Sequence, residues 1–447
     1  MCSPLSILSV LATLLQTLAV LALLTAVLPL NLAIVIPAFL WSRMRPAPRH
    51  PALRPQRILL TGGKMTKALQ LARCFNAAGH SVVLVETHKY WLSGHRFSNA
   101  VERFYTVPAP EEDADGYVAA LLDLVQQENI DAFIPVSSPV ASAYDAMAGE
   151  ALAPHCQVIH SSPDAVAMLD DKFKLCETAR SLGLSAPKAV LITSPQQILS
   201  FDFKTDSGPY LLKSLRYDAV SRLDMTRLPF PGMAAYVESL PISEANPWVM
   251  QEFISGQEYC THSTVRQGTI RLHCCSKSSP FQVNYDHVDK PEIYAWVKTF
   301  VRALNLTGQI SFDVIQSADG TVYPIECNPR THSAITMFYN HPDVAEAYLT
   351  DSAIGDPITP LPGSRPTYWL YHEIWRLTGI TSWAEFQAWR QTIAEGTDAL
   401  FQWQDPLPFL MVPHWQITLL LLNNLRQLKR WVKIDFNIGK LVERGGD

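Results

Sequence analysis

The sequence predicts a mixed fold, in which an α/β domain with a parallel sheet is followed by an α+β region. Short apolar strands alternate with amphipathic helices between Arg57 and Val136, which is typical of a parallel sheet. From Glu258 to Arg330 one strand follows another with few helices between, which favours antiparallel pairing. A third feature, the uncharged apolar run Leu5–Trp41, predicts a membrane helix at the N-terminus.

The apolar run is longer than one bilayer span requires, and Pro29 and Pro37 interrupt it. A single tilted or kinked helix and a short re-entrant hairpin both fit that length. Because the first charges, Arg43 and Arg45, follow the run, the positive-inside rule places the remaining chain in the cytoplasm. A cleaved signal peptide fits less well, since no basic segment precedes the run and no small-residue cleavage site follows it. We expect a retained anchor, and we expect removal of residues 1–45 to leave catalysis intact.

Composition narrows the classes of function. The chain has 447 residues, enough for about two to four domains. Its 36 Lys and Arg against 41 Asp and Glu, with a pI near 6.2, give no support to a nucleic-acid partner. Eight cysteines without a C-x-x-C pair suit reduced thiols in the cytoplasm. The oligomeric state is not determined by these features.

Changes in composition divide the chain into five segments. They are an apolar membrane anchor over 1–42, a Pro- and Arg-rich linker over 43–56, an α/β domain over 57–166, a second domain over 167–346, and a C-terminal extension over 347–447. We expect the extension to be helical, with a long helix over His414–Trp431.

The α/β domain gathers polar residues at one edge of its sheet. Its expected strands are Arg57–Thr61, Ser81–Glu86 and Ala132–Val136. One helix follows Gly62-Gly63-Lys64 and ends near Ala78, and another covers Gly116–Glu128. Because ligands of such sheets bind at the carboxyl ends of the strands, the residues after each strand are candidates for binding.

The second domain begins with a helix and continues as strands. The expected helices are Asp170–Leu182 and Ile293–Leu304, and the expected strands are Ser185–Thr193, Pro209–Ser214, Trp248–Ile254, Glu258–Arg266 and Thr269–Cys275. The last two should pair as antiparallel neighbours.

The most informative segment is an expected hairpin over Gly308–Arg330, with Ala318-Asp319-Gly320 as its turn. Glu326 and Asn328 are two residues apart in a strand and therefore project to one face. Pairing through the turn brings Asp313 back onto them. Two carboxylates and an amide oxygen suit Mg²⁺, whose shell phosphate oxygens usually complete.

Arg330 lies just beyond this hairpin and carries a planar guanidinium suited to phosphate. The hairpin therefore predicts Mg²⁺-nucleotide chemistry. An ordinary solvated hairpin is disfavoured, because Phe312, Val314 and Ile325 indicate buried strands, in which a carboxylate needs a partner.

These motifs together resemble the ATP-grasp superfamily. The resemblance implies a pre-ATP-grasp domain over 57–166 and an ATP-grasp domain over 167–346, with ATP and Mg²⁺ as cofactors and Mn²⁺ as an alternative ion. By resemblance, Lys172 and Lys213 hold the nucleotide phosphates, and Glu258 binds the ribose. The hinge strand, whose backbone meets adenine, consists of Gln251, Glu252, Phe253 and Ile254. The metal ligands are Asp313, Glu326 and Asn328, and Arg330 completes an E-x-N-P-R motif.

A narrower resemblance runs from the linker to Asp447. The segments that carry it are Gly62–Ala72, His88–Asn99, Ser137–Ser142, Cys260–Val265, Asn328–Pro342 and Lys433–Val442. They are similar to the mycosporine-glycine synthase family, which acts in the cyanobacterial biosynthesis of mycosporine sunscreens and so in UV protection. The resemblance implies ATP-dependent joining of glycine to 4-deoxygadusol, with release of ADP and phosphate.

Two residues are expected to be catalytic. Arg330 would stabilise the moving phosphoryl group, and His332 would act as general base for the amine. The acceptor should face the γ-phosphate from the first sheet. Candidates to bind it are Lys64, His88, Lys89, His95, Arg96, Ser137, Ser138, Thr331 and Ser333.

Two other functions remain open. The first is a carboxylate–amine ligase of the D-alanyl–D-alanine or dipeptide type, which proceeds through an acyl phosphate. The second is a membrane-tethered nucleotide-binding subunit without turnover, which the complete set of lysines and metal ligands disfavours. The sequence does not decide whether glycine is the exclusive amine or whether serine or alanine also enters.

Overall fold

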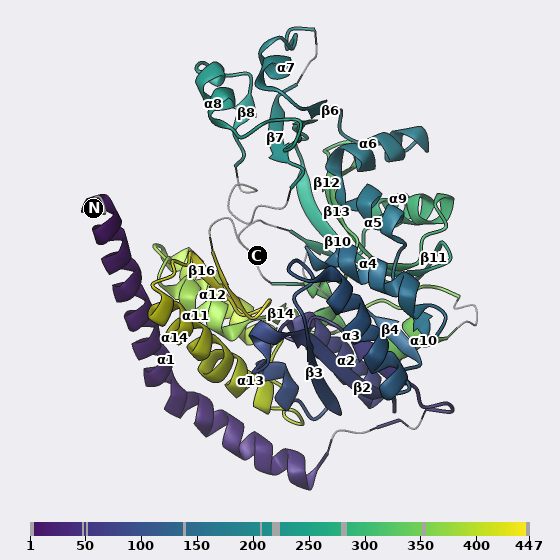
Figure 1. The fold of residues 1–447 in the computed structure, drawn as a ribbon, viewed down its shortest axis with the longest axis vertical. Helices are drawn as coiled ribbons and strands as arrows, with labels where there is room; N and C mark the ends of the chain where they lie inside the picture. Colours follow the sequence, from purple (N-terminus) through teal and green to yellow (C-terminus); the bar gives the residue numbers. More distant parts are fainter. Residues whose placement is uncertain are drawn as a thin grey trace.

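The protein combines three main sheets with a long N-terminal helix that runs along one side of the molecule (Figure 1). The computed structural model describes residues 4–46, 49–50, 52–136, 140–205, 208–216, 224–278, 284–350 and 355–443, with side chains from residue 11 onward.

The first sheet is parallel, as the alternation of strands and helices predicts. Its strands are β1 Arg57–Leu60, β2 Ser81–Thr87, β3 Arg103–Val107, β4 Ala132–Ile134 and β5 Gln157–Val158, in the order β3-β2-β1-β4-β5. The connecting helices are α2 Thr66–Ala77, α3 Ala114–Gln127 and α4 Ala141–Leu152. The sequence analysis missed β3 and β5. Both are edge strands with half-exposed residues, so they lack the apolar run that marks β1 and β2.

The other two sheets are antiparallel. The smaller one contains β6 Ala189–Ile192, β7 Tyr210–Ser214, β8 Arg227–Leu228 and β9 Trp248–Glu252, in the order β6-β9-β7-β8. The larger one contains β10 Gln257–Arg266, β11 Thr269–Lys277, β12 Gly308–Gln316 and β13 Val322–Asn328, in the order β11-β10-β12-β13. Helices α5 Pro163–Asp170, α6 Lys172–Ser181, α7 Pro195–Leu199, α8 Met233–Ser239 and α9 Pro291–Ala303 accompany them.

The expected helix Asp170–Leu182 is in fact the junction of two helices. Asp170 ends α5, and Asp171 caps α6 by accepting hydrogen bonds from the backbone N–H groups of Phe173 (2.9 Å) and Lys174 (3.0 Å). A capping aspartate satisfies N–H groups that have no partner within the helix. The consequence for the site is that Lys172 becomes the first residue of α6.

The C-terminal extension is not wholly helical, which corrects the sequence prediction. Its helices are α10 Val344–Leu349, α11 Leu370–Leu377, α12 Trp383–Glu395, α13 Leu407–Met411 and α14 Thr418–Gln427, and its strand pairs are β14 Thr367–Tyr368 with β15 Thr397–Asp398 and β16 Lys433–Asp435 with β17 Lys440–Val442. The predicted long helix is shorter. A π-helical turn, η5 Val412–Ile417, contains Pro413, and α14 stops at Leu428, which has a φ of 53°. Proline removes a backbone donor, which accounts for the irregular turn.

The apolar N-terminal segment forms one continuous helix, α1 Pro4–Met44, so the re-entrant hairpin is wrong. Residues Leu11–Met44 are long and apolar enough to cross a membrane, although a signal sequence would meet the same criteria. The helix packs against α13, η5 and α14. Trp431 Nε1 donates to Thr17 Oγ1 at 2.9 Å, and Asn31 Nδ2 donates to the Tyr371 hydroxyl at 2.8 Å.

This packing argues against the expectation that removal of residues 1–45 leaves catalysis intact. Val20, Leu24 and Val35 of α1 belong to the same buried cluster as Val412 and Leu421. Removing α1 would expose these apolar side chains to water and leave Tyr371 and Trp431 without their partners on the helix. The helix is therefore part of the folded body rather than a detachable tether.

Candidate active site

The hairpin β12–β13 brings the three predicted metal ligands together. Asp313 and Glu326 are direct cross-strand partners, and Ser311 pairs with Asn328 two residues along the same ladder. Asn328 Nδ2 donates to Asp313 Oδ2 at 3.3 Å. The sequence predicted this register from the turn and from the period of two residues in a strand, and the prediction is correct.

Lys172 and Lys213 approach the carboxylates from two different elements. The Lys172 ammonium, at the start of α6, lies 3.4 Å from Glu326 Oε1. Lys213 comes from β7 of the smaller sheet. Burial lowers the pKa of Lys213, and the negative charges of Glu326, Glu258 and Asp313 oppose that shift. The lysine therefore lies among carboxylates of the larger sheet, at the place where the two antiparallel sheets face one site.

Arg330 lies beside the same cluster of carboxylates and lysines. Its Nη2 donates to Asn328 Oδ1, and its Nη1 lies 3.8 Å from Asp170 Oδ1. Burial raises the pKa of Asp170, and the Arg330 charge partly offsets that effect. The guanidinium is thus held beside the metal ligands by two partners, which fixes the direction of its planar fork.

The chemistry of this donor set fits a divalent cation. Burial, reinforced by the charges of Glu326 and Glu258, raises the pKa of Asp313 to about 7. The raised pKa reflects a buried carboxyl group beside two other carboxylates, and a bound cation would favour the charged form of all three. Among the described residues there is no group of three or more His, Cys, Asp or Glu side chains suited to hold a metal. Asp313, Glu326 and Asn328 instead supply two carboxylates and one amide oxygen. This set suits a magnesium ion that phosphate oxygens also bind.

Four consecutive residues form the expected adenine hinge at the end of β9. The Gln251 side chain is buried and donates from Nε2 to the Ile325 carbonyl oxygen at 3.2 Å, which ties the smaller sheet to the hairpin. Glu252 accepts from the Lys188 backbone N–H at 3.0 Å, and the Arg227 guanidinium lies 3.8 Å from the centroid of the Phe253 ring. Ile254 follows the strand and is half-buried. The side chains of Gln251, Glu252 and Phe253 contact other groups of the protein. The backbone groups of the hinge therefore remain the predicted contacts to adenine.

Glu258, the predicted ribose ligand, begins β10 a few residues after the hinge. Its Oε1 accepts a hydrogen bond from Ser278 Oγ at 2.9 Å. Its charge influences both Lys213 and Asp313, so it belongs to the same cluster. The role in ribose binding stays a prediction.

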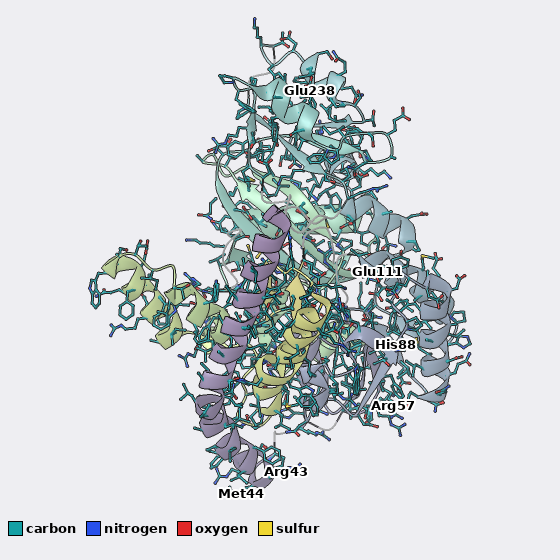
Figure 2. The ribbon with its side chains drawn as sticks, turned by 60° about the vertical axis from the view of Figure 1, so that its left-hand side comes forward. Arg43, Met44, Arg57, His88, Glu111 and Glu238 are labelled. Carbon is teal, nitrogen blue, oxygen red and sulfur yellow. The ribbon has the colours of Figure 1, made fainter. Side chains whose placement is uncertain are left out.

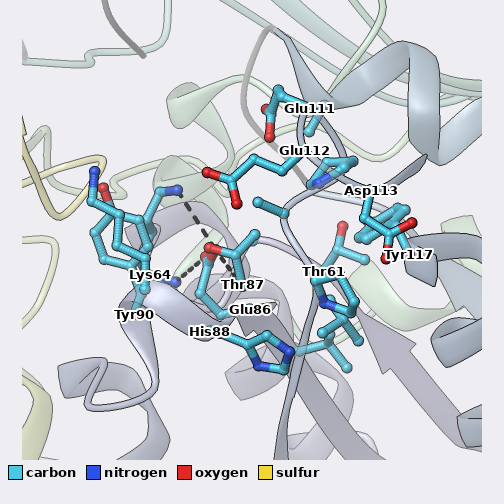
Figure 3. A pocket seen from close by; sticks show the side chains of 18 of the residues that line it. Thr61, Lys64, Glu86, Thr87, His88, Tyr90, Glu111, Glu112, Asp113 and Tyr117 are labelled. Carbon is cyan, nitrogen blue, oxygen red and sulfur yellow. Dashed lines mark hydrogen bonds and ion pairs between the residues drawn. The ribbon is translucent and has the colours of Figure 1, made fainter. Parts of the chain in front are cut away.

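A pocket of about 460 Å³ opens at the carboxyl ends of β1, β2 and β3 (Figure 3). Lys64 lines it on one side, next to Tyr90 (Figure 3). The Lys64 backbone N–H donates to Glu86 Oε2 at 3.0 Å, its ammonium lies 3.5 Å from Glu86 Oε1, and the same ammonium lies 4.1 Å from the centroid of the Tyr90 ring. The polar residues that also line the pocket are Thr61, Thr87, His88, Lys89, Glu111, Glu112, Asp113 and Tyr117.

His95 and Arg96 do not line this pocket. His95 is fully buried, its Nδ1 lies 3.1 Å from the Gly63 carbonyl oxygen, and burial lowers its pKa to about 3. Arg96 donates to the Trp91 carbonyl oxygen at 2.5 Å and stacks over Phe104. Both residues therefore stabilise the loop after β2, and their assignment to the acceptor is not supported by their position. Ser137 and Ser138 lie outside the described residues.

The C-terminal extension places Ser333 in a structural contact. Ser333 Oγ lies 2.7 Å from Asn437 Nδ2, and the Asn437 carbonyl oxygen accepts from the Thr66 backbone N–H at 2.9 Å. Gly439, with a φ of 69°, approaches so closely that a Cβ there would lie 2.3 Å from the Lys64 carbonyl oxygen. The segment Asn437–Gly439 thus holds the loop that carries Lys64.

His332 lies in surroundings that do not favour a general base. Burial lowers its pKa to about 3, with further lowering by Lys67 and Arg330. Its Nδ1 accepts from the Ala334 backbone N–H at 3.2 Å, so the nitrogen that would take a proton already has a donor. Efficient bases at neutral pH have a pKa near 7. The catalytic role of His332 stays a prediction without support from its environment.

Lys67 is a further candidate residue of the active site, which the sequence did not indicate. It lies in the first turn of α2, and its buried ammonium donates to the Thr331 carbonyl oxygen at 2.7 Å. Burial lowers its pKa well below the usual value, and the charges of Arg330 and Lys64 lower it further. Lys67 therefore lies between the Arg330 cluster and the pocket around Lys64. The only feature in the sequence that could have indicated it is its place three residues after Lys64.

Comparisons with known proteins agree with this geometry. No family model matches the chain, and no curated protein matches it in sequence. Among solved structures, the ADP complex of PurK, an N5-carboxyaminoimidazole ribonucleotide synthetase, is 13% identical over 74% of this chain and 86% of that one, with a TM-score of 0.54. The N5-carboxyaminoimidazole synthetase of Staphylococcus aureus, complexed with ADP, is 14% identical over 72% of this chain and 82% of that one, with a TM-score of 0.51. The fold is that of these synthetases.

At these identities the likeness extends to the fold alone. The predicted parallel α/β sheet, followed by antiparallel strands, is confirmed, whereas the likeness does not decide the substrates.

The raised pKa of Asp313 predicts a pH-dependent affinity for Mg²⁺. In the metal-free protein Asp313 takes up a proton as the pH falls through about 7, and a metal ligand must be deprotonated. We expect affinity for Mg²⁺-ADP to be constant above pH 8 and to fall up to about tenfold per pH unit below 7. Calorimetry in buffers of different ionisation enthalpy should show proton release on binding near pH 7. Removing the Glu326 charge lowers the pKa of Asp313, so Glu326→Gln should shift any such release to lower pH.

The raised pKa of Asp313 also affects the free energy of unfolding. Its effect on the pH dependence of that free energy is opposite to that of an ordinary salt-bridged carboxylate, whose pKa is lowered by folding. Because the folded-state pKa of Asp313 exceeds the unfolded one, the metal-free protein binds more protons when folded. The contribution of Asp313 to the free energy of unfolding therefore falls as the pH rises from about 4 to about 7. Bound Mg²⁺ should remove that dependence. A melting temperature with the same pH dependence with and without Mg²⁺-ADP would contradict the assignment of Asp313 as a ligand.

Proposed function

We propose that the chain is an ATP-dependent ligase that joins glycine to 4-deoxygadusol and releases mycosporine-glycine, ADP and phosphate. The observation that carries the proposal is the convergence of Asp313, Glu326, Lys172, Lys213 and Arg330 on one site of an ATP-grasp fold. The choice of substrates rests on the resemblance of the sequence to the mycosporine-glycine synthase family. The domain limits 57–166 and 167–346 belong to the same proposal.

The nucleotide would bind between the two antiparallel sheets. Lys172, at the N-terminus of α6, and Lys213, on β7, would hold its phosphates, since ammonium groups and a helix N-terminus both attract anions. Adenine would meet the backbone of Glu252 to Ile254, and the ribose would meet Glu258. Asp313, Glu326 and Asn328 would hold Mg²⁺, which neutralises the β- and γ-phosphate charge when bound.

The acceptor would occupy the pocket around Lys64. Its volume of about 460 Å³ suits a small molecule. The Lys64 ammonium would pair with the enolate oxygen, and Thr61, Glu86 and His88 offer hydrogen-bond partners to ring hydroxyl groups. Lys67 and Thr331 connect this pocket to Arg330, so the acceptor oxygen can face the γ-phosphate.

The reaction needs an activated leaving group. The enol oxygen attacks the γ-phosphorus and the bond from that phosphorus to the bridging oxygen of ADP breaks, which leaves an enol phosphate. The glycine amine then adds to the ring carbon, loses a proton, and the carbon–oxygen bond breaks to release phosphate. Arg330, held beside Asn328, would stabilise charge on the phosphoryl group in both steps.

A second candidate shares the same nucleotide site. A carboxylate–amine ligase would phosphorylate a carboxylate instead of an enol, and only the acceptor distinguishes the two. The acidic side chains that line the pocket, Glu86 and Glu111 to Asp113, favour a ring whose hydroxyl groups can donate to them over a simple amino-acid carboxylate. A subunit without turnover is disfavoured by the presence of all five converging charged groups.

The test is acceptor-dependent release of ADP by the purified full-length chain with ATP and Mg²⁺. We expect release only when 4-deoxygadusol and glycine are both present, together with a product heavier by glycine less water. Serine and alanine in place of glycine measure amine selectivity. Release with pairs of amino acids, and none with 4-deoxygadusol, would move the assignment to the dipeptide-type ligase.

A further inference from the structure

The long helix α1 presents two different faces along its length. The face toward the body carries the buried residues Thr17, Val20, Leu24, Asn31, Val35, Ala38 and Ser42, spaced three, four or seven apart. Such spacing is that of one helical face. The opposite face carries large apolar side chains in water-accessible positions, among them Leu11, Leu15, Leu18, Leu30, Ile36 and Leu40. The Leu15 and Leu30 side chains are 67% and 65% exposed.

The docked face makes a transmembrane orientation unfavourable. Thr17 and Asn31, which bond Trp431 and Tyr371, lie about 21 Å apart along the helix axis at 1.5 Å per residue. The hydrocarbon core of a bilayer is about 30 Å thick. If α1 crossed it, α14 and β17 would have to enter the hydrocarbon with Arg426 and with Glu443, whose carboxylate accepts from Asn424 at 3.3 Å. Charged groups at that depth are costly.

We call the exposed apolar face of α1 the stripe. At its C-terminal end it is followed by residues typical of a membrane interface. Beyond the last apolar turn, the Arg43 guanidinium lies 5.1 Å from the centroid of the Phe39 ring, and Arg45 lies 4.7 Å from that of Trp41. Arg49 and Arg54 follow and are exposed. The chain as a whole has a net charge of −5, so this basic cluster is local. Aromatic and cationic side chains of this kind occupy the headgroup region of anionic membranes.

The apolar surface does not end with α1. Helix α14, which packs beside α1, exposes Leu422, and the segment after it exposes Leu428 and Val432. Figure 2 shows α1 and α14 running side by side down one face, with Arg43 and Met44 at the lower end of α1. Figure 2 also shows the parallel sheet with His88 and Glu111 on another side of the molecule, so occupation of this face leaves the acceptor pocket open.

We propose that α1 lies in the plane of one leaflet of an anionic bilayer and attaches the protein as a monotopic membrane protein. The exposed stripe of α1 enters the acyl boundary, the docked face stays on the enzyme body, and the Arg43–Arg54 cluster contacts anionic headgroups. Both ends of the chain then lie on the same side of the membrane. An exposed stripe with no charged side chain from Leu11 to Ser42 suits lipid better than a protein surface, in which polar groups would need partners.

Vesicle flotation tests the surface. The full-length protein should float with vesicles of phosphatidylcholine and phosphatidylglycerol, and less with phosphatidylcholine alone. The double variant Leu15→Asp/Leu30→Asp should reduce the bound fraction about tenfold or more. Leu191→Asp is the matched control, because Leu191 is exposed on β6, outside both the stripe and the Arg43–Arg54 cluster, and the charge change per site is the same. Melting temperature and Mg²⁺-ADP affinity should match the wild type in both variants. Those readouts are independent of whether the substrates proposed above are correct.

Protease accessibility tests the orientation. With one epitope tag before Met1 and another after Asp447, protein bound to sealed vesicles from outside should lose both tags to added protease. Protection of the N-terminal tag alone would show a spanning helix and overturn the proposal. So would an intact mass that lacks residues 1–44, which would indicate a cleaved signal peptide. A protein that ignores vesicles and buries the stripe in a dimer would overturn it as well.

Discussion

Glu326→Gln is expected to lower kcat/KM for ATP by about two to four powers of ten, the range that a metal worth several kcal/mol of transition-state stabilisation implies. The substitution keeps the shape of the side chain and removes its charge. Glu326 faces Asp313 across the hairpin and lies 3.4 Å from the Lys172 ammonium, so its loss weakens both the Mg²⁺ site and the phosphate contact. Steady-state ADP release at several Mg²⁺ concentrations measures the effect.

Glu292→Gln is the matched control for this prediction. Glu292 lies on the exposed first turn of α9, outside the cluster, and its replacement removes the same charge. We expect its kcat/KM to remain within about twofold of the wild type, as is usual for surface substitutions. If Glu326→Gln retained wild-type turnover at limiting Mg²⁺, the hairpin would not be the metal site.

Arg330→Met should lower kcat by about 10³, because an arginine that stabilises a transferring phosphoryl group contributes that much or more. Affinity for Mg²⁺-ADP should change far less, since Lys172 and Lys213 hold the phosphates in our proposal. The distinguishing result is a large loss of kcat with little loss of affinity for Mg²⁺-ADP. Single-turnover ADP formation gives the first, and calorimetry gives the second.

Arg330→Lys separates charge from geometry. A lysine keeps the positive charge and lacks the planar fork that reaches Asn328 and faces Asp170 together. We expect it to recover only part of the lost kcat. Should Arg330→Met reduce nucleotide affinity as strongly as it reduces kcat, then Arg330 would serve binding or the local structure rather than phosphoryl transfer.

The sequence predicted the hairpin and the two lysines beside it well because their determinants are local. The turn at Ala318 to Gly320 and the two-residue period of β13 define the register that pairs Asp313 with Glu326. Lys172 follows a capping aspartate, which also leaves a local pattern. Such features need no knowledge of distant contacts, so the hairpin and the two lysines were found with nearly correct bounds.

The acceptor side was predicted less well because long-range packing determines it. His95 follows Ser93 and Gly94 in a loop that looks polar, yet Gly94 N–H donates to Gln416 Oε1 at 2.7 Å, and a Cβ on Gly94 would lie 2.6 Å from the Val412 backbone nitrogen. The C-terminal extension thus buries this loop. Lys67 was missed because its place beside Thr331 depends on a contact between residues far apart in the sequence.

The N-terminal helix shows a further limit of sequence patterns. Its residues are apolar on all sides, so its periodicity does not reveal which face packs against protein. Asn31 and Thr17 are two of its polar residues, and both bond groups of the C-terminal extension. The partner of α1 comes from residues some 340 positions later in the chain, which no local pattern encodes.

Isotope transfer tests the proposed ligation most directly. The acceptor 4-deoxygadusol, labelled with ¹⁸O at the oxygen that nitrogen replaces, would be supplied with ATP, Mg²⁺ and glycine to the full-length protein. Phosphorylation of the enol predicts that the label appears in the released phosphate, in equal amount to ADP and mycosporine-glycine. Unlabelled phosphate, or product formed without ADP, would contradict the account.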